Sequence, residues 1–110
     1  MTDRLDKMRM ELRRGVLVLA VLAALRQERY GYSLRKALIA AGIDIEEGTL
    51  YPLIRRLEGF GLLSSEWRSE DGRRKRYYRI SEEGTALLAT LTAEWQSTNE
   101  SVRALLEEQS

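Results

Sequence analysis

The densest positive charge in the sequence is a run of four cations, Arg73, Arg74, Lys75 and Arg76. Guanidinium and ammonium groups donate hydrogen bonds to phosphate oxygens, and cations this close together repel one another unless an anion binds them. Asp71-Gly72, just before the run, is a tight-turn signal, so we expect a hairpin with its polar loop over residues 69–75. Because basic hairpin tips also keep sheet edges from aggregating, a solvated loop stays the alternative.

Two tyrosines, Tyr77 and Tyr78, follow this run. Neighbouring residues of a strand face opposite sides. We therefore expect one ring in the core and the other, predicted to be Tyr77, against a phosphate.

A second candidate surface lies on a helix expected over Glu46–Phe60. Its buried side is indicated by apolar residues at helical spacing, Leu50, Leu53, Ile54 and Leu57. The outward side then carries groups that suit phosphates or base edges, namely Thr49, Tyr51, Arg55 and Arg56. Pro52 lies past the first turn and is expected to distort the helix locally. An ordinary solvated face explains these residues equally well when they are taken alone.

Catalysis and metal binding find little support. The chain has no histidine and no cysteine, which removes the commonest general base and the thiolate ligands. We expect no enzyme activity, metal or cofactor. Residues 1–80 hold 17 Lys and Arg against 11 Asp and Glu, whereas residues 81–110 hold one Arg and six Glu. A basic front and an acidic tail indicate a polyanion-binding part and a separate role for the tail.

The longest apolar stretch, Gly15–Leu25, has about eleven residues, too few to cross a bilayer, which needs about 20. No targeting pattern is visible, so we expect a cytoplasmic protein without membrane contact.

Periodicity and turn signals predict the order helix, helix, helix, strand, strand, helix. The expected elements are a helix from Thr2 or Asp3 to Gln27 that kinks or splits at Gly15, a turn at Tyr30–Tyr32, a helix from Tyr32 or Ser33 to Ala41, a helix over Glu46–Phe60, strands over Leu62–Arg68 and Arg76–Ile80, and a helix from Ser81 to Glu107.

Capping residues should mark the helix ends. Ser33 is the expected N-cap of the second helix and Gly42 its C-cap, and Asp44 with Glu47 forms a candidate capping box. The strand over Leu62–Arg68 alternates, with Leu63, Ser65 and Trp67 on one face. We expect Trp67 in the core of the hairpin sheet.

The last helix carries a seam with spacings of three and four, formed by Leu88, Leu91, Trp95, Thr98, Val102 and Leu105. A helix of about 26 residues is about 39 Å long and overhangs so small a domain, which favours a homodimer. Packing onto the chain's own first helix is the alternative. We divide the chain into a DNA-binding domain over residues 1–81 and a dimerisation helix over residues 82–110.

The predicted architecture is α+β and mainly α: a winged helix-turn-helix domain with a two-stranded β wing and a long C-terminal dimerisation helix. The motifs Gly31-Tyr32, Gly48–Glu58, Gly61-Leu62-Leu63, Gly72–Ser81 and Gly84 resemble the PadR family of winged-helix transcriptional regulators over about residues 11–108. The single C-terminal helix resembles the short subfamily, in which this helix mediates dimerisation. The resemblance implies a repressor released by a small molecule or another signal.

The sequence therefore predicts a sequence-specific DNA-binding regulator, a homodimeric repressor of an inverted-repeat operator with half-sites about 10 bp apart. The predicted DNA-binding residues are Tyr32, Ser33, Thr49, Tyr51, Pro52, Arg55, Arg56, Arg73, Arg74, Lys75, Arg76 and Tyr77. The predicted dimer interface is Leu5, Met8, Leu12, Leu88, Leu91, Trp95, Val102 and Leu105. A winged-helix module that binds an acidic protein, without an operator, is the alternative.

Trp95 lies in the middle of the seam. A tryptophan at a similar place in the multidrug-sensing branch of the PadR family stacks flat aromatic ligands between subunits. Trp95 is thus either a platform for a flat aromatic effector or a filler of the interface.

Overall fold

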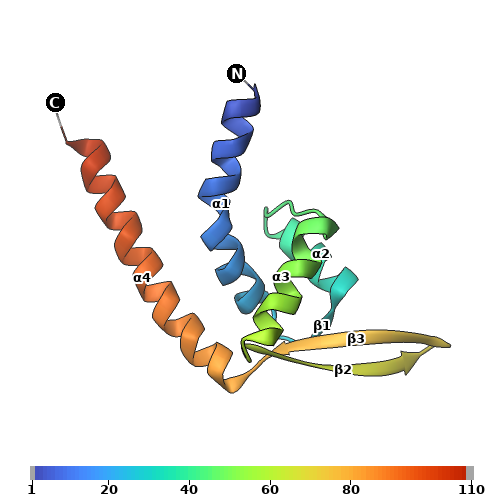
Figure 1. The fold of residues 1–110 in the computed structure, drawn as a ribbon. Coiled ribbons are helices and arrows are strands. Elements are labelled where there is room, and N and C mark those ends of the chain that lie inside the picture. Colours follow the sequence, from blue (N-terminus) through green and yellow to red (C-terminus); the bar gives the residue numbers. More distant parts are fainter. Residues whose placement is uncertain (1, 109–110) are drawn as a thin grey trace.

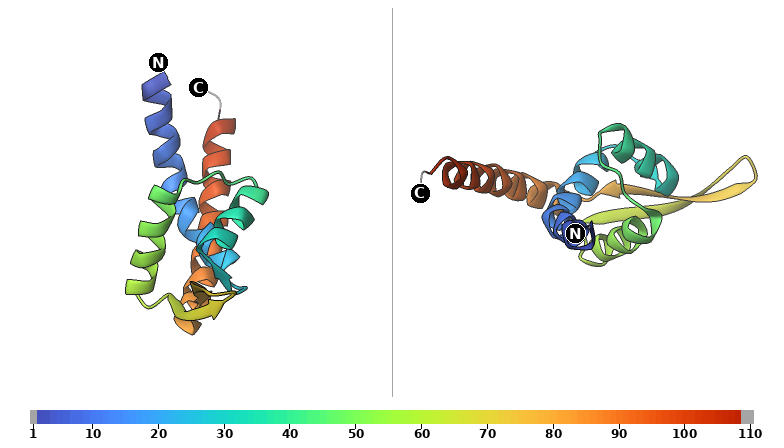
Figure 2. Two further views of the ribbon diagram at one scale, coloured as in Figure 1. Left: turned by 90° about the vertical axis from the view of Figure 1, so that its right-hand side faces the viewer. Right: turned by 90° about the horizontal axis from the view of Figure 1, so that it is seen from above.

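The computed structural model describes residues 2–108, in which three short strands and four helices form a helical body with two projecting arms. Its elements are α1 (Thr2–Ala24), β1 (Arg29–Tyr30), α2 (Gly31–Ala40), α3 (Glu47–Gly59), β2 (Leu63–Glu70), β3 (Arg73–Ile80) and α4 (Glu82–Glu107). The β2–β3 hairpin, called the wing below, extends in one direction and α4 in the other (Figures 1 and 2). The predicted winged-helix architecture with a long C-terminal helix is confirmed.

The core lies where the second half of α1 meets α2, α3 and the base of the wing. Its buried side chains are Val21, Leu22, Leu25, Leu34, Leu38, Ile45, Leu50, Leu53, Ile54, Leu57 and Leu63. The predicted inward side of α3 is therefore confirmed. Burying this apolar surface fixes α3 and the wing relative to each other, and so positions the two basic segments.

The first helix is not split: it runs through Gly15 without interruption, and it ends at Ala24 rather than at Gln27. Two arginine side chains bond the carbonyls at its end: Arg26 Nε donates to Ala23 O and Arg29 Nε donates to Ala24 O, both at 3.0 Å. They satisfy acceptors that a longer helix would have bonded itself.

The predicted turn at Tyr30–Tyr32 is wrong, because Arg29–Tyr30 forms the short strand β1 and α2 begins at Gly31. Ser33 is consequently not the N-cap. Tyr30 occupies the N-cap position, and the Ser33 hydroxyl accepts from Tyr30 N at 3.1 Å and donates to Tyr30 O at 3.0 Å. The C-cap of α2 is Ala41 and not Gly42 as predicted, but Gly42 ends the helix as the next residue: it has a φ of 94°, and Ile43 N donates to Leu38 O at 2.8 Å.

The predicted Asp44–Glu47 capping box is also wrong. Glu46 is the N-cap of α3, without a side-chain cap bond, and Asp44 lies two residues before it. At the other end, Gly61 has a φ of 78° and Leu62 N donates to Leu57 O at 3.0 Å, which turns the chain into β2. The helix continues through Pro52.

The wing strands are longer than predicted. Asp71 and Gly72 have φ values of 50° and 75°, so a two-residue turn with positive φ closes the hairpin. The predicted loop over residues 69–75 is therefore wrong, and the basic run lies in β3. The sheet order is β1-β3-β2, with β1 pairing to β3 through Arg29↔Tyr78 and Tyr30↔Tyr77.

Alternation along β2 follows the prediction, but Trp67 does not lie in the core. Leu63, Ser65 and Trp67 pair with Ile80, Tyr78 and Arg76, and Trp67 is 53% exposed. The hairpin extends beyond the helical body (Figure 1), and the exposure of Trp67 follows from this.

The last helix is held tightly at its start. The helix predicted from Ser81 begins at Glu82, and Ser81 is its N-cap: the Ser81 Oγ accepts from Gly84 N at 3.0 Å and donates to Gly61 O at 2.6 Å. A Cβ placed on Gly84 would lie 2.2 Å from Leu62 O, so only glycine fits this contact. No helix among residues 2–108 is long and apolar enough to cross a membrane.

Candidate nucleic-acid interface

Most of the α3 residues that the sequence predicted to bind DNA lie on the solvent side of this helix. Thr49, Pro52, Arg55 and Arg56 are exposed. Tyr51 is half-buried and packs beside the start of α2, where a Cβ on Gly31 would lie 2.7 Å from its Cε1 atom. The exposed side of α3 thus presents a hydroxyl and two guanidinium groups, next to a tyrosine that the body holds in place.

The start of α2 adds an exposed aromatic ring. Tyr32 is 57% exposed, its ring stacks at 6.4 Å on Tyr30, and Lys36 Nζ lies 5.4 Å from the ring centroid. The Ser33 hydroxyl is half-buried and already bonded to the Tyr30 backbone. The exposed Tyr32 is therefore the better donor to a phosphate here.

The basic run divides between the two faces of the wing because strand residues alternate. Arg74 and Arg76 share a face with Trp67, and their Cζ atoms lie 5.0 and 5.5 Å from its ring centroid. Arg73 and Lys75 lie on the opposite face, where Lys75 Nζ is 4.4 Å from the Tyr30 ring centroid. Both faces of the wing therefore carry cations.

One of these cations ties the wing to α3. Arg76 Nη2 lies 3.2 Å from Glu58 Oε2, Arg76 Nε donates to Ser65 Oγ at 2.9 Å, and the Ser65 hydroxyl donates to Glu58. A charge-assisted bond of this kind holds two elements at a fixed angle. Sequence reasoning missed Glu58 and Ser65, since their meeting depends on how α3 packs on the wing.

Arg68 lies on the wing face opposite to Trp67 and Arg76, and a second network of ion pairs there offsets its charge. Its guanidinium bonds Glu28 through both oxygens, at 2.6 and 2.7 Å, and also bonds Glu66. These carboxylates hold the pKa of Arg68 above its ordinary value. Its Cζ lies 4.7 Å from the ring centroid of Tyr77.

The tyrosines that follow the basic run have different surroundings. The Tyr77 hydroxyl donates to Glu70 Oε1 at 2.5 Å, and this bond raises the pKa of Tyr77 to about 12. Burial raises the pKa of Tyr78, which packs against the core. Both phenols are thus neutral at ordinary pH.

Comparison with known proteins identifies the family. The family model of the PadR-like transcriptional regulators matches residues 18–90. The chain belongs to the PadR family. It is therefore a transcriptional regulator and not an enzyme, and it shares the winged-helix fold of a family whose members bind DNA.

Several PadR-family relatives resemble the chain over nearly its whole length. The transcriptional regulator Rv3488 of Mycobacterium tuberculosis is 39% identical over 101 residues, 91% of this chain and 92% of that protein. A PadR family regulator from Eggerthella lenta has a TM-score of 0.91 and 46% identity, covering 98% of this chain and 96% of the other. A PadR-like regulator from Bacillus cereus has a TM-score of 0.79 and 28% identity, covering 90% and 99%.

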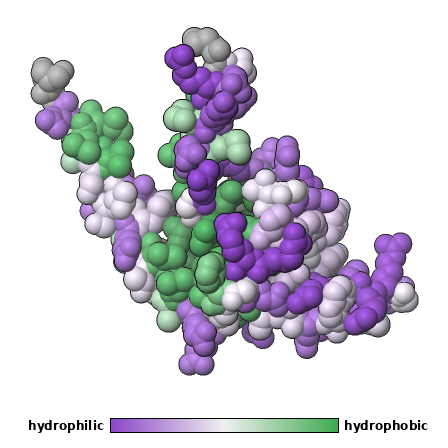
Figure 3. All heavy atoms as spheres, in the orientation of Figure 1, coloured by the Kyte–Doolittle hydropathy of each residue, from purple (hydrophilic) through white to green (hydrophobic). Residues whose placement is uncertain are grey.

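The two long helices of this PadR-family chain leave apolar side chains uncovered. On α1, Leu5, Met8 and Leu12 are 50%, 57% and 78% exposed. On α4, Trp95, Val102 and Leu105 are 42%, 47% and 66% exposed, whereas Leu88 and Leu91 are half-buried. The helices diverge toward their free ends, and apolar surface shows near the C-terminal end of α4 and between the helices (Figures 1 and 3).

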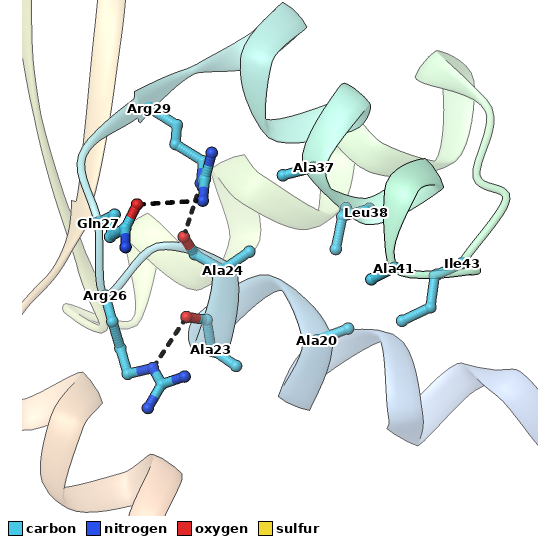
Figure 4. Close-up of a pocket in the computed structure, with 10 residues that line it drawn as sticks. All are labelled: Ala20, Ala23, Ala24, Arg26, Gln27, Arg29, Ala37, Leu38, Ala41 and Ile43. Atoms are coloured by element: carbon cyan, nitrogen blue, oxygen red, sulfur yellow. Dashed lines mark hydrogen bonds between the residues drawn. The ribbon is translucent and has the colours of Figure 1, made fainter.

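The described part of this PadR-family chain, residues 2–108, has cavities at several places on its surface. One of about 500 Å³ lies between α1 and α2 over an alanine-rich floor, including Ala20, Ala37 and Ala41, with Arg26 and Arg29 at its rim (Figure 4). A second lies between α1 and the start of α3, beside Arg13 and Thr49. The third separates α3 from the wing. Trp95 lines none of the three.

Among residues 2–108 no group of three or more acidic side chains is arranged to hold a metal ion.

Proposed function

We propose that this PadR-family protein binds specific sites in duplex DNA as a homodimer and represses transcription until a small molecule releases it. The observation that carries the proposal is the pair of exposed cationic segments, Arg55 and Arg56 on α3 and Arg73 and Arg74 on the wing. The shared core holds these segments together. DNA offers phosphates on both sides of a groove that admits one helix, which suits such a pair.

The contacts divide by chemistry. On α3, Thr49 and Arg55 would read base edges in the major groove, with Tyr51, Pro52 and Arg56 lying against its wall. On the wing, Arg73, Arg74, Lys75, Arg76 and Tyr77 would face phosphates, with Tyr32 and Ser33 adding backbone contacts from α2. Arg76 is paired with Glu58, which offsets part of its positive charge. Arg73 and Arg74 would therefore supply most of the positive charge that the wing presents to DNA.

A second copy of the chain would cover the exposed side chains of α1 and α4. Leu5, Met8 and Leu12 would meet the seam of Leu91, Trp95, Val102 and Leu105 across a two-fold axis. Residues 1–81 then form the DNA-binding domain and residues 82–110 the dimerisation helix. Two-fold symmetry requires an inverted-repeat operator with half-sites about 10 bp apart, or a multiple of this spacing.

Trp95 and its symmetry mate are proposed to bind the effector. The indole is 42% exposed in the single chain, and Glu94 and Glu100 lie close to it in sequence. Stacking on indole beside carboxylates favours a flat aromatic cation. Titration with planar cationic dyes, followed by fluorescence, should show tighter binding to wild type than to Trp95→Ala. Equal affinity would exclude Trp95 as the platform.

The test of the central proposal is binding to duplex DNA over a series of salt concentrations. A DNA-binding regulator should lose affinity steeply as salt rises, because phosphate contacts release counterions. Sequencing the genomic fragments that the protein retains should then reveal an inverted repeat. Absence of DNA binding at low salt, together with retention of an acidic protein, would favour a protein-interaction module instead.

A further inference from the structure

The cavity between α3 and the wing has a lining suited to a strand of nucleic acid. Its volume is about 520 Å³ and its lining residues are Arg55, Glu58, Gly59, Trp67, Arg76 and Tyr78. We propose that this groove holds one sugar–phosphate strand of the duplex, with the Trp67 indole packed against a deoxyribose. The inference rests on the proposed function and assigns a DNA contact to a residue that the sequence placed in the core.

Charge in the groove favours an anion. The acidic residues of β2, Glu66 and Glu70, lie on the other face of the wing by strand alternation. Glu58 is the one carboxylate in the lining, and Arg76 and Ser65 already bond it. Arg55 at one wall, and Arg74 beside Trp67, make no ion pair or hydrogen bond within residues 2–108 and keep their full charge for a phosphate.

The indole of Trp67 needs a covering group. It is 53% exposed although it is the largest apolar side chain of the wing. Arg74 and Arg76 lie near its ring, which fixes the ring without covering it. Bases of a duplex are paired and stacked, whereas the deoxyribose presents C–H groups outward next to the phosphates that arginines bind. A sugar is therefore the part of the strand that an indole beside two guanidinium groups meets.

The pose of Trp67 depends on α3 through a chain of contacts. Glu58 holds Arg76, and Arg76 lies 5.5 Å from the Trp67 centroid and directly across the strand pair. Glu58 is in this sense a positioning residue, because it holds Arg76 and so orients the wing face that would meet DNA.

The first test uses fluorescence, since the chain holds two tryptophans, Trp67 and Trp95. A short mixed-sequence duplex is added at low salt to wild type and to Trp67→Phe, with binding followed separately by anisotropy of a labelled duplex. A DNA-dependent change in tryptophan emission is expected in wild type and should be nearly absent in Trp67→Phe, which retains only Trp95. Equal emission changes in both proteins at saturation would overturn the proposal.

The second test compares affinities. Removal of the indole, which the proposed strand would cover, should weaken DNA binding about tenfold in Trp67→Ala, with Trp67→Phe intermediate. The salt slope should stay unchanged, because an indole neutralises no phosphate. Phe60→Ala is the matched control, since Phe60 is an exposed aromatic that does not line the groove. The affinity of Phe60→Ala should equal that of wild type, and thermal unfolding should show that all three variants remain folded.

The outcomes separate this inference from the function on which it rests. If wild type fails to bind any duplex, the proposed function falls and the inference with it. If wild type binds with a steep salt dependence while Trp67→Ala binds equally well, only the role of Trp67 is overturned.

Discussion

The Tyr51 ring lies directly against the backbone of Gly31, so close that a Cβ on Gly31 would be 2.7 Å from Tyr51 Cε1. This contact joins α3 to the start of α2 at the side that we propose to face DNA. A glycine is favoured here by the approach of the ring and not by backbone conformation, since Gly31 has no positive φ.

Gly31→Ala should therefore displace the Tyr51 ring and lower the free energy of unfolding by about 1–2 kcal/mol, the usual cost of overpacking. Urea denaturation measures the change. Gly48→Ala is the control, because a Cβ on Gly48 meets nothing within 4 Å. If the two variants were equally stable, the contact would not constrain the fold.

Two wing arginines should differ in how they affect the salt dependence of DNA binding. Arg73 is exposed and makes no ion pair within residues 2–108, whereas Arg68 is bonded to Glu28 and Glu66. Arg73→Ala should weaken binding to all sequences about equally and lower the salt slope by about 1. Arg68→Ala should leave the slope nearly unchanged. Equal slopes for Arg73→Ala and wild type would remove Arg73 from the phosphate contacts.

The proposed dimer is best tested at Leu105, which is 66% exposed, because a charge there leaves the chain's own core intact. Leu105→Glu should give monomers in equilibrium sedimentation, since it would place an unpaired charge in an apolar interface. Gln96→Glu adds the same charge on the opposite side of α4 and should remain dimeric. A dimer that persists in Leu105→Glu would place the interface elsewhere.

The bond between Tyr77 and Glu70 predicts a dependence of stability on alkaline pH. The pKa of Tyr77 is about 12 in the folded chain against an ordinary 10.0, so the folded state keeps a proton that the unfolded state has released. The stabilising contribution is complete below pH 10 and is lost as pH rises from about 10 to about 12. Tyr77→Phe should flatten this part of the unfolding profile. In a phenolate absorbance titration, Glu70→Gln should bring the ionisation of Tyr77 to lower pH.

Periodic and locally encoded features of this chain could be predicted from its sequence. The leucine and isoleucine spacing of α3 identified its buried side, and Ser81 marked the start of α4, because each depends on residues within one or two turns. Gly42 was equally recognisable, since a positive φ at a helix end favours glycine.

Features that depend on how elements meet could not be predicted in this way. The Arg76–Glu58 bond joins residues 18 apart in sequence, and it exists only because α3 packs on the base of the wing. The alternation of β2 placed Trp67 on the same strand face as Leu63, but its exposure depends on where the hydrophobic core ends along the hairpin. Tyr30 displaced Ser33 from the cap because pairing with Tyr77 on β3 draws Tyr30 into the sheet.

The junction at Ser81 turns α4 into a rigid lever. Ser81 bonds Gly61, and Gly84 lies so close to Leu62 O that the first turn of α4 cannot slide on the body. A helix of 26 residues is about 39 Å long, so a tilt of about 10° at this junction moves its far end by about 7 Å. In a two-fold dimer joined through α4, the same tilt in each subunit changes the separation of the two α3 helices by ångströms. A small change in packing beside Trp95 would thus make the spacing of the two α3 helices differ from the spacing of half-sites one helical turn apart.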